Sequence, residues 1–295
     1  MDPISRRDAG KLLVTGAAWL GLREAPGMSS GKIDSIVHGV QIGAQSYSFR
    51  DRPLEACIEG FKVTGLGECE LWAGHLEPRD AGPDEVRKWH LSTPLSNFHG
   101  VRQKFAGSGI RLYAYTFGFR SDLTDEEIER GFQEANALGV KIITSSANVS
   151  VAPRVDRIAR KYKITVGFHG HDQTDRPDEF STPETFAKAM AGASKYVGVN
   201  LDIGHFVAAG GDPVAYIREN HAKIVTLHIK DRKKHHGANL PFGEGETPIV
   251  EVLRLLRDQR WKIPANIEYE YGNPGMDTIA EVKRCYAYMR KALEG

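Results

Sequence analysis

The stretch Val197-Gly198-Val199-Asn200-Leu201-Asp202-Ile203-Gly204-His205 joins a run of strand-forming residues to an Asp-x-x-His sequence at its end. Valine and leucine at this density favour a buried β-strand. The strand would then deliver the carboxylate of Asp202 and the imidazole of His205 to the same edge of a sheet.

Three other apolar runs also end in side chains that can ligate a metal. Residues 164–171 carry His169 and His171, residues 224–231 carry His228, and residues 263–268 end in Glu268. If the carboxyl ends of these four strands face the same way, His, Asp, His and Glu converge on one site. Nitrogen and oxygen donors of this kind suit a divalent transition metal.

Strand-like runs alternate with helix-like segments along most of the chain. Apolar residues with 3.6-residue spacing lie between the runs, Thr124 and Thr182 precede helix-like segments, and Gly139 follows one. Continuous apolar strands are typical of a parallel sheet that is buried on both faces. We therefore predict a single (β/α)₈ TIM barrel, with strands at about 40–47, 67–72, 110–117, 140–145, 164–169, 197–202, 223–229 and 264–269. A doubly wound open sheet is the alternative, but no glycine-rich nucleotide-binding motif follows any strand.

Composition narrows the class of protein. The 295 residues are 41% hydrophobic and 26% charged, which is enough to bury a full core and excludes a disordered chain. A net charge of +1 gives no reason to expect nucleic acid or an anionic membrane as partner. Cys57, Cys69 and Cys285 have neither zinc-cluster nor disulfide spacing, so we expect buried thiols.

The N-terminus differs from the rest of the chain. Arg6 and Arg7 precede an apolar run at 12–22 and a linker rich in glycine, proline and serine. This order resembles a twin-arginine export signal and predicts a periplasmic protein, with a disordered or amphipathic tail as the alternative. The run is too short for a comfortable membrane span. We assign 1–31 to the signal and linker and 32–295 to the barrel.

The motifs Leu201-Asp202-Ile203-Gly204-His205-Phe206, Leu227-His228-Ile229-Lys230-Asp231 and Ile267-Glu268 together resemble the xylose isomerase-like TIM-barrel superfamily over residues 40–290. This superfamily contains sugar isomerases and epimerases, inosose dehydratases and endonuclease IV. The resemblance implies one divalent cation, manganese first and cobalt, magnesium or zinc as alternatives. Its implied ligands are His169, Asp202, His228 and Glu268.

The fifth strand departs from the epimerase pattern. Epimerases carry there a glutamate that serves as metal ligand and as one of two proton-transfer carboxylates, whereas this chain offers His169. An imidazole can still ligate the metal, but a symmetric two-glutamate proton shuttle is lost. Glu268 is then expected as the only inner carboxylate besides Asp202, and we assign Glu268 and His169 as the catalytic pair.

Other polar and aromatic residues at predicted strand ends are candidates for sugar binding. His171 and His205 would contact the substrate or support a ligand, and Lys230 would pair with a developing oxyanion unless it is a solvated loop lysine. The aromatic candidates would stack on a sugar face unless they are packing residues. The full set is Glu70, Trp72, His75, Phe119, His171, His205 and Lys230.

These features predict a metal-dependent sugar enzyme that acts through an enediolate, of the isomerase or epimerase type. The alternative is a lyase or dehydratase acting on 3-oxo-glycosides or inosose-like substrates. A metal-free sugar-binding protein and an abasic-site endonuclease are weaker hypotheses. The expected partner is a small sugar or oxo-glycoside, and the sequence is compatible with a homo-oligomer.

Overall fold

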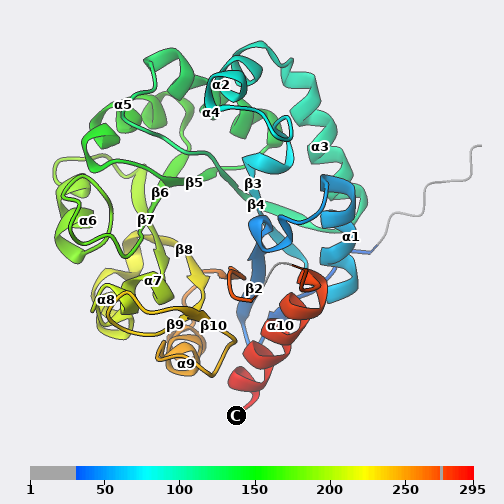
Figure 1. Cartoon of the computed structure of the whole chain (residues 1–295), viewed down its shortest axis with the longest axis vertical. Coiled ribbons are helices and arrows are strands. Elements are labelled where there is room, and N and C mark those ends of the chain that lie inside the picture. The colour runs from blue at the N-terminus through cyan, green and yellow to red at the C-terminus, as the bar shows by residue number, and fades with distance from the viewer. Residues whose placement is uncertain (1–30, 273–274) are drawn as a thin grey trace, which may run out of the picture.

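A computed structural model describes residues 31–272 and 275–295 and contains a closed barrel of parallel strands (Figure 1). Each neighbouring pair in the ring is parallel, and the pairing of the first strand with both the second and the last closes it. The predicted TIM barrel is therefore confirmed. Its strands are β2 (Val40–Gln45), β3 (Glu68–Trp72), β4 (Arg111–Thr116), β5 (Ile142–Ser146), β6 (Thr165–His169), β7 (Val197–Asp202), β8 (Ile224–Ile229) and β11 (Ala265–Ile267).

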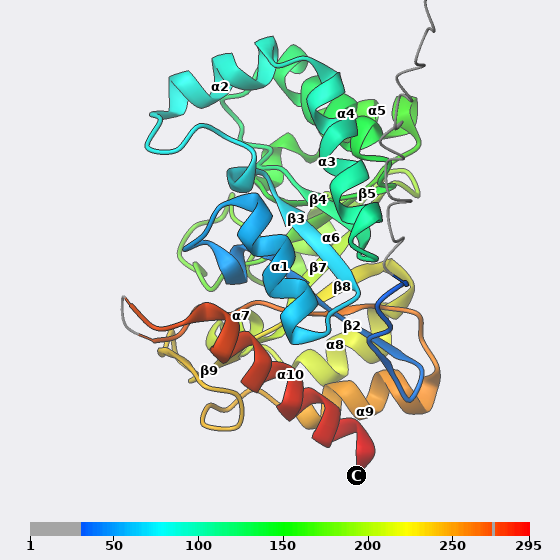
Figure 2. The same cartoon turned by 90° about the vertical axis from the view of Figure 1, so that its right-hand side faces the viewer.

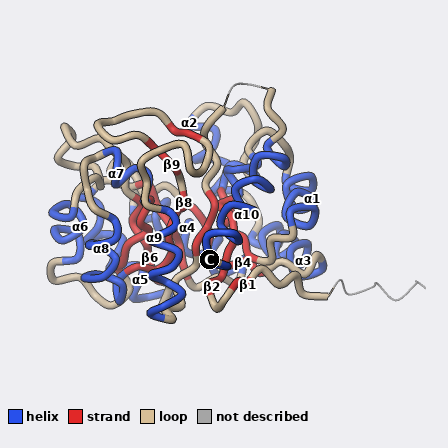
Figure 3. Tube along the Cα trace, turned by 90° about the horizontal axis from the view of Figure 1, so that it is seen from below, coloured by secondary structure: helices blue, strands red, loops and turns tan. Residues whose placement is uncertain are grey.

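Helices surround these strands (Figure 3). They are α1 (Leu54–Thr64), α2 (Pro83–Ser92), α3 (Leu95–Gly107), α4 (Asp125–Leu138), α5 (Ala152–Tyr162), α6 (Pro183–Met190), α7 (Ile203–Ala208), α8 (Pro213–Asn220), α9 (Ile249–Gln259) and α10 (Thr278–Glu294). The first and last helices, α1 and α10, pack side by side on the outside of the barrel (Figure 2). The strand β3 is followed by two helices rather than one, which builds extra structure next to its carboxyl end.

Short elements complete the fold. The strand β1 (Ile36–Val37) pairs antiparallel with β2, and β9 (Asp231–Arg232) pairs antiparallel with β10 (Asn239–Leu240). Single 3-10 turns occur at η1 (Ser46–Phe49), η2 (Ala73–His75), η3 (Val149–Val151) and η4 (His221–Lys223). The turns η1 and η2 follow β2 and β3 directly, so they lie at the carboxyl-terminal face of the barrel.

The helix boundaries expected from the sequence are formed by capping residues. Thr124 caps α4 through a reciprocal capping box with Glu127, and Gly139 ends the helix at a φ of +77°. Thr182 precedes α6 in the same way. Cys57, Cys69 and Cys285 are buried, free thiols, as predicted.

The interior of the barrel has a polar upper layer. Asn266 on β11 occupies space beside Gly43 on β2, where an added Cβ would lie 2.3 Å from the Asn266 Oδ1 atom. Glycine at this point lets a polar side chain cross the barrel axis below the strand ends.

The predicted export signal at 1–31 falls almost wholly on residues outside the described part of the chain. Within the described residues, no helix is long and apolar enough to cross a membrane.

Candidate metal centre

Four of the sequence-predicted residues meet at the carboxyl-terminal end of the barrel. His169 ends β6, Asp202 ends β7, His228 lies near the end of β8, and Glu268 directly follows β11. One potential ligand atom from each lies within 4.8 Å of all the others. All four side chains are buried, so these polar atoms face each other rather than bulk water.

Neighbouring side chains of this cluster lie within ion-pair distance of one another. The Glu268 Oε2 atom lies 3.0 Å from His228 Nδ1 and 3.8 Å from His169 Nε2, and the latter lies 3.6 Å from Asp202 Oδ2. Ligands held about 2.0–2.2 Å from one ion are separated from each other by roughly 3–3.5 Å. The spacing of the cluster is therefore close to that of a shared coordination shell.

Two buried atoms of the cluster support the same conclusion. His169 Nε2 and Asp202 Oδ2 make no hydrogen bond to any described residue, although Asp202 Oδ2 has an ion-pair contact with Lys230. Buried polar atoms are almost always satisfied, because leaving one unpaired costs about 1–3 kcal/mol. A cation bound between the two would satisfy both, and two imidazoles with two carboxylates suit manganese, cobalt or zinc. The residues present thus fit a divalent metal.

Glu70 lies beneath His228 and fixes the orientation of its ring. His228 Nε2 lies 2.9 Å from Glu70 Oε1, while His228 Nδ1 faces Glu268. Thr116, Thr144 and Asn266 also donate hydrogen bonds to the Glu70 carboxylate. Burial opposes ionisation of Glu70, but the charge and hydrogen bond of His228 outweigh it and lower the pKa. A carboxylate behind an imidazole is the usual arrangement that orients a metal-ligating histidine.

Lys230 brings a buried positive charge into the cluster. Its Nζ atom lies 2.9 Å from Glu268, 3.1 Å from Asp202 and 2.6 Å from Glu270. Gly204 permits this approach, because a Cβ there would lie 2.8 Å from the Lys230 carbonyl oxygen. Only 2% of Lys230 is exposed, so the alternative of a solvated loop lysine is wrong.

The charges around Glu268 keep it ionised. Burial alone would raise its pKa, but His228 and Lys230 outweigh burial and lower the pKa well below the ordinary value. Asp202 behaves in the same way, because Lys230 and His205 overcome the cost of burial and lower its pKa. In contrast, burial and repulsion from His169 lower the pKa of His171 to about 3, so that ring is neutral at pH 7.

A cavity of about 280 Å³ opens above the cluster, and we call it the inner cavity. It brings together the predicted residues Trp72, His169, His171, His205, His228 and Glu268. The remaining lining residues are Gln45, Tyr47, Thr116, Thr144, Ser146, Asn200 and Glu270.

Two predicted substrate contacts, Glu70 and Phe119, require correction, and a third, His75, lies outside the inner cavity. Glu70 is fully buried below His228, so it does not reach sugar hydroxyls, and it is a further inner carboxylate beside Glu268. Phe119 is fully buried and stacks on Phe132 in the core, with ring centroids 5.3 Å apart. His75 Nε2 donates to the Ser46 carbonyl oxygen at 2.9 Å, and His75 lines a larger neighbouring cavity instead of the inner cavity.

A set of supporting polar residues was missed at the level of sequence. Asn200, Thr226 and Asn266 each lie two positions before a cluster residue or its strand end, so they face the same side of the strand. Asn200 lies 3.0 Å from His228 Nε2, and Asn266 donates to both Glu70 and Thr226. The signal was present in the sequence as a polar residue inside an otherwise apolar strand, two residues before a ligand type.

Comparison with known proteins agrees with this geometry. A family model described as "Xylose isomerase-like TIM barrel" matches residues 108–291, which is more than half of the chain. The chain belongs to this family. The match spans the strands that carry all four cluster residues. None of the curated proteins matches the sequence.

Solved structures of the xylose isomerase-like fold superpose on the chain at low sequence identity. An L-ribulose 3-epimerase is 15% identical with a TM-score of 0.66, covering 86% of this chain and 95% of that one. A sugar phosphate isomerase/epimerase from Parabacteroides distasonis is 16% identical with a TM-score of 0.63, covering 89% and 97%. A probable 3-DHS dehydratase from Bacillus anthracis is 15% identical with a TM-score of 0.64, covering 87% and 99%. At these identities the likeness shows a shared fold.

Proposed function

We propose that the protein is a divalent-metal-dependent sugar enzyme that moves a proton on a keto- or aldo-sugar through an enediolate, with an isomerase or epimerase type of reaction. The observation that carries the proposal is the buried cluster of His169, Asp202, His228 and Glu268, all of which except Asp202 line the inner cavity. Membership of a family whose structural neighbours include an epimerase and an isomerase/epimerase supports the same class.

In the proposed reaction, Glu268 accepts the proton on the carbon next to the substrate carbonyl. The C–H electron pair moves into the enediolate, and return of the proton to the neighbouring carbon or the opposite face gives the isomer or epimer. Glu268 begins this step as a carboxylate, because His228 and Lys230 hold its pKa below the ordinary value. A divalent ion held by the four residues would polarise the substrate oxygens and acidify that proton.

Lys230 and His169 would serve the same reaction in different ways. The Lys230 ammonium, beside Asp202 and Glu268, places a fixed positive charge where an oxyanion develops. His169, on β6 next to the strand that carries Asp202, faces both carboxylates and would ligate the metal or take part in proton transfer. The neutral ring of His171 lies next to His169, with ring centroids 4.9 Å apart, and would contact the substrate without adding charge.

The test is deuterium exchange in D₂O with manganese-loaded protein and a panel of aldoses, ketoses and 3-oxo-glycosides. We expect exchange with wild type and a loss of roughly 10²–10⁴-fold in Glu268→Gln, the usual worth of a positioned base. The variant keeps an oxygen donor, so most of the metal should stay bound. Equal exchange by wild type and Glu268→Gln would show that another group moves the proton.

A lyase or dehydratase is the second candidate, and His169 favours it. With an imidazole in place of the fifth-strand glutamate, the two proton-transfer groups are unlike, which suits a base on one side and an acid on the other. From the same enediolate, the β-carbon–oxygen bond would break and the leaving oxygen would be protonated. A dehydratase among the structural neighbours is in keeping with this. Release of the leaving group from a 3-oxo-glycoside, rather than a stereoisomer, would identify this reaction.

We also propose that the protein is exported, on the evidence of Arg6 and Arg7 before the apolar run at 12–22. Replacing both arginines with lysine should retain the protein in the cytoplasmic fraction. The wild-type protein should appear in the periplasmic fraction, and equal distribution of the two forms would contradict the proposal.

A further inference from the structure

A second and larger cavity adjoins the candidate site, and we call it the outer cavity. Its volume is about 770 Å³. It is formed by the segment after β2, the segment after β3, and the helices α2 and α3. In a (β/α)₈ barrel, segments that follow the strands form the catalytic face, so the outer cavity lies on the same face as the metal centre.

Trp72 connects the two cavities because it lines both of them. Its ring meets the edge of Tyr47, a residue of the inner cavity, at a centroid distance of 5.0 Å. Arg50, a residue of the outer cavity, lies 4.8 Å from the centroid of that same Tyr47 ring. The two cavities therefore lie on either side of a thin layer of aromatic side chains that includes Trp72.

The volumes of the two cavities indicate that each would hold a different part of one ligand. Most small-molecule sites have volumes of about 300–1,000 Å³. The inner cavity, at about 280 Å³, has room for one sugar unit above the metal centre. Anything attached to that unit must lie outside the inner cavity, and the outer cavity is the adjoining space of sufficient size.

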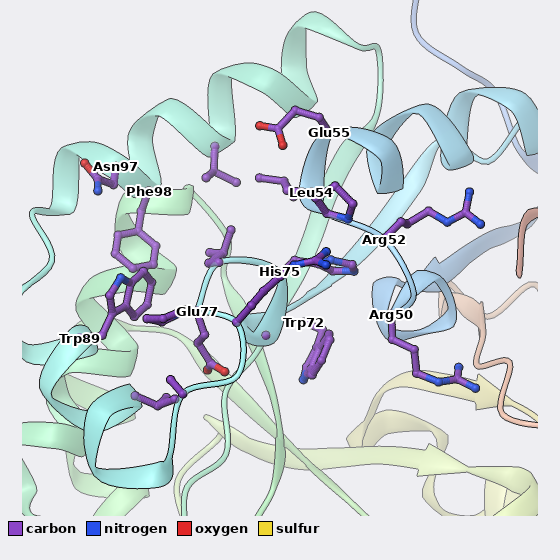
Figure 4. A pocket seen from close by; sticks show the side chains of 18 of the residues that line it. Arg50, Arg52, Leu54, Glu55, Trp72, His75, Glu77, Trp89, Asn97 and Phe98 are labelled. Atoms are coloured by element: carbon purple, nitrogen blue, oxygen red, sulfur yellow. The ribbon is translucent and has the colours of Figure 1, made fainter. Parts of the chain in front are cut away.

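The lining of the outer cavity has the mixed character of a sugar-ring site. In the view of Figure 4, Trp89 lies at one side and Trp72 near the middle, with Glu77 between them. Tryptophan faces can stack on the C–H face of a ring, while Asn97 and Arg79 supply hydrogen-bond donors for hydroxyl groups.

Several charges in the outer cavity are already neutralised by neighbours. Lys104 pairs with Glu55 at 2.5 Å, and Glu77 pairs with His90 at 3.0 Å. Among the described residues, no ion pair involves Arg50 or Arg79. Arg50 already donates to the backbone carbonyl oxygens of Tyr47 and Tyr269, so Arg79 is the guanidinium group that can hydrogen-bond a neutral polyhydroxyl ring.

We propose that the outer cavity is a subsite for a second ring, joined by a glycosidic bond to the sugar that occupies the inner cavity. The ligand class is therefore a disaccharide-sized glycoside rather than a free monosaccharide. This inference rests on the proposed function only in placing the reacting sugar at the metal centre. The binding claim itself concerns size, stacking and hydrogen bonding, so it is testable without turnover.

The experiment compares fructose with three disaccharides that contain a fructose unit linked at different positions, namely lactulose, turanose and isomaltulose. Calorimetric titration of the manganese-loaded full chain gives the affinity of each. We expect at least one disaccharide to bind about tenfold or more tightly than fructose. Equal affinities for fructose and all three disaccharides would overturn the proposal.

Gly100→Phe tests where the second ring lies. Gly100 is on α3, lines the outer cavity, and has open space where a Cβ would be placed. The substitution fills the cavity and replaces a helical glycine, so it should not weaken the helix. We expect the ratio of disaccharide to fructose affinity to fall to about one. Ala106→Phe, on the exposed side of the same helix and outside both cavities, is the matched control and should retain the wild-type ratio.

Arg79→Ala gives an independent test if Gly100→Phe fails to fold, because Arg79 is exposed and pairs with no described carboxylate. The ratio should fall several-fold. An unchanged ratio in both folded variants would overturn the placement of the second ring. Deuterium exchange is measured in parallel: absence of exchange with a normal affinity ratio would contradict the proposed function alone, whereas exchange without any disaccharide preference would contradict the subsite alone.

Discussion

Buried glutamates at the two ends of the barrel interior have pKa values shifted in opposite directions. Glu70 and Glu68 lie two positions apart on β3, and both are fully buried. Glu70, below the metal centre, receives hydrogen bonds from several partners and has a lowered pKa. Glu68, toward the opposite end, has one oxygen without a hydrogen bond to any described residue, and burial raises its pKa to about 7.

The difference between these glutamates comes from their partners, because their burial is the same. The cluster around Glu70 includes His228, whose charge and hydrogen bond favour the anion. Glu68 has Arg111 at 3.1 Å, but the Arg111 side chain is 56% exposed and its charge is screened by water. An ionised buried carboxylate is therefore stabilised by its partners at the carboxyl-terminal end of the strands and is costly at the other end. Variants of residues at the two ends test this contrast.

Removal of a cluster residue should abolish metal binding without unfolding the barrel. Asp202→Ala and His228→Ala each delete a candidate ligand at the end of a strand, while the core beneath is retained. We expect bound divalent metal, measured by elemental analysis after dialysis, to fall to background in both variants. The circular dichroism spectrum should stay that of an α/β protein. Full metal occupancy in both variants would refute the site assignment.

Glu70→Gln should weaken metal binding by roughly 10–100-fold, the usual effect of losing the carboxylate behind a ligating histidine. The glutamine keeps the shape of the side chain but no longer accepts a charge-assisted hydrogen bond from His228. Glu68→Gln is the matched control on the same strand and should leave metal affinity unchanged. Equal losses in the two variants, measured by metal titration, would show a general effect of burial instead.

Glu68→Gln should instead change the pH dependence of stability. Because the folded pKa of Glu68 is raised from 4.5 to about 7, its favourable contribution is present below pH 4.5 and is lost as the pH rises through 7. The variant removes this loss, so its free energy of unfolding at pH 8 should exceed that of wild type by about 1–2 kcal/mol. This difference is below the upper limit set by linkage, which is about 1.36 kcal/mol for each unit by which the pKa is raised. Urea unfolding at pH 5 and pH 8 provides the measurement. A wild-type difference between the two pH values that persists in the variant would contradict it.

Trp72→Ala should have the smallest effect, and it continues the series along β3 to the rim. Trp72 lines the inner cavity but lies outside the metal cluster. Loss of aromatic stacking worth about 0.5–1.5 kcal/mol should raise KM for the sugar roughly 2–10-fold while metal affinity stays the same. Steady-state kinetics with metal titration measures both, and a weakened metal affinity would mean that Trp72 also shapes the cluster.

The strands and the four cluster residues could be predicted from the sequence because their signals are local. Each barrel strand lies within about three residues of its predicted limits at either end, since apolar runs bounded by turn residues specify both the element and its length. Asp202 and His228 end such runs, so the parallel barrel geometry brings them to one face without further information.

The roles of Glu70, Lys230 and Phe119 were decided by the tertiary structure. Side-chain alternation along a strand gives the face of a residue, but not its depth in the barrel or its partners across the axis. Glu70 meets His228 across a sequence separation of 158 residues, and Phe119 is covered by Phe132 from α4. The sequence by itself determined the barrel and the cluster residues at the carboxyl-terminal end of its strands. Only the packing of distant segments decided which carboxylate supports the metal centre and where the outer cavity lies, because those properties depend on contacts that no local pattern encodes.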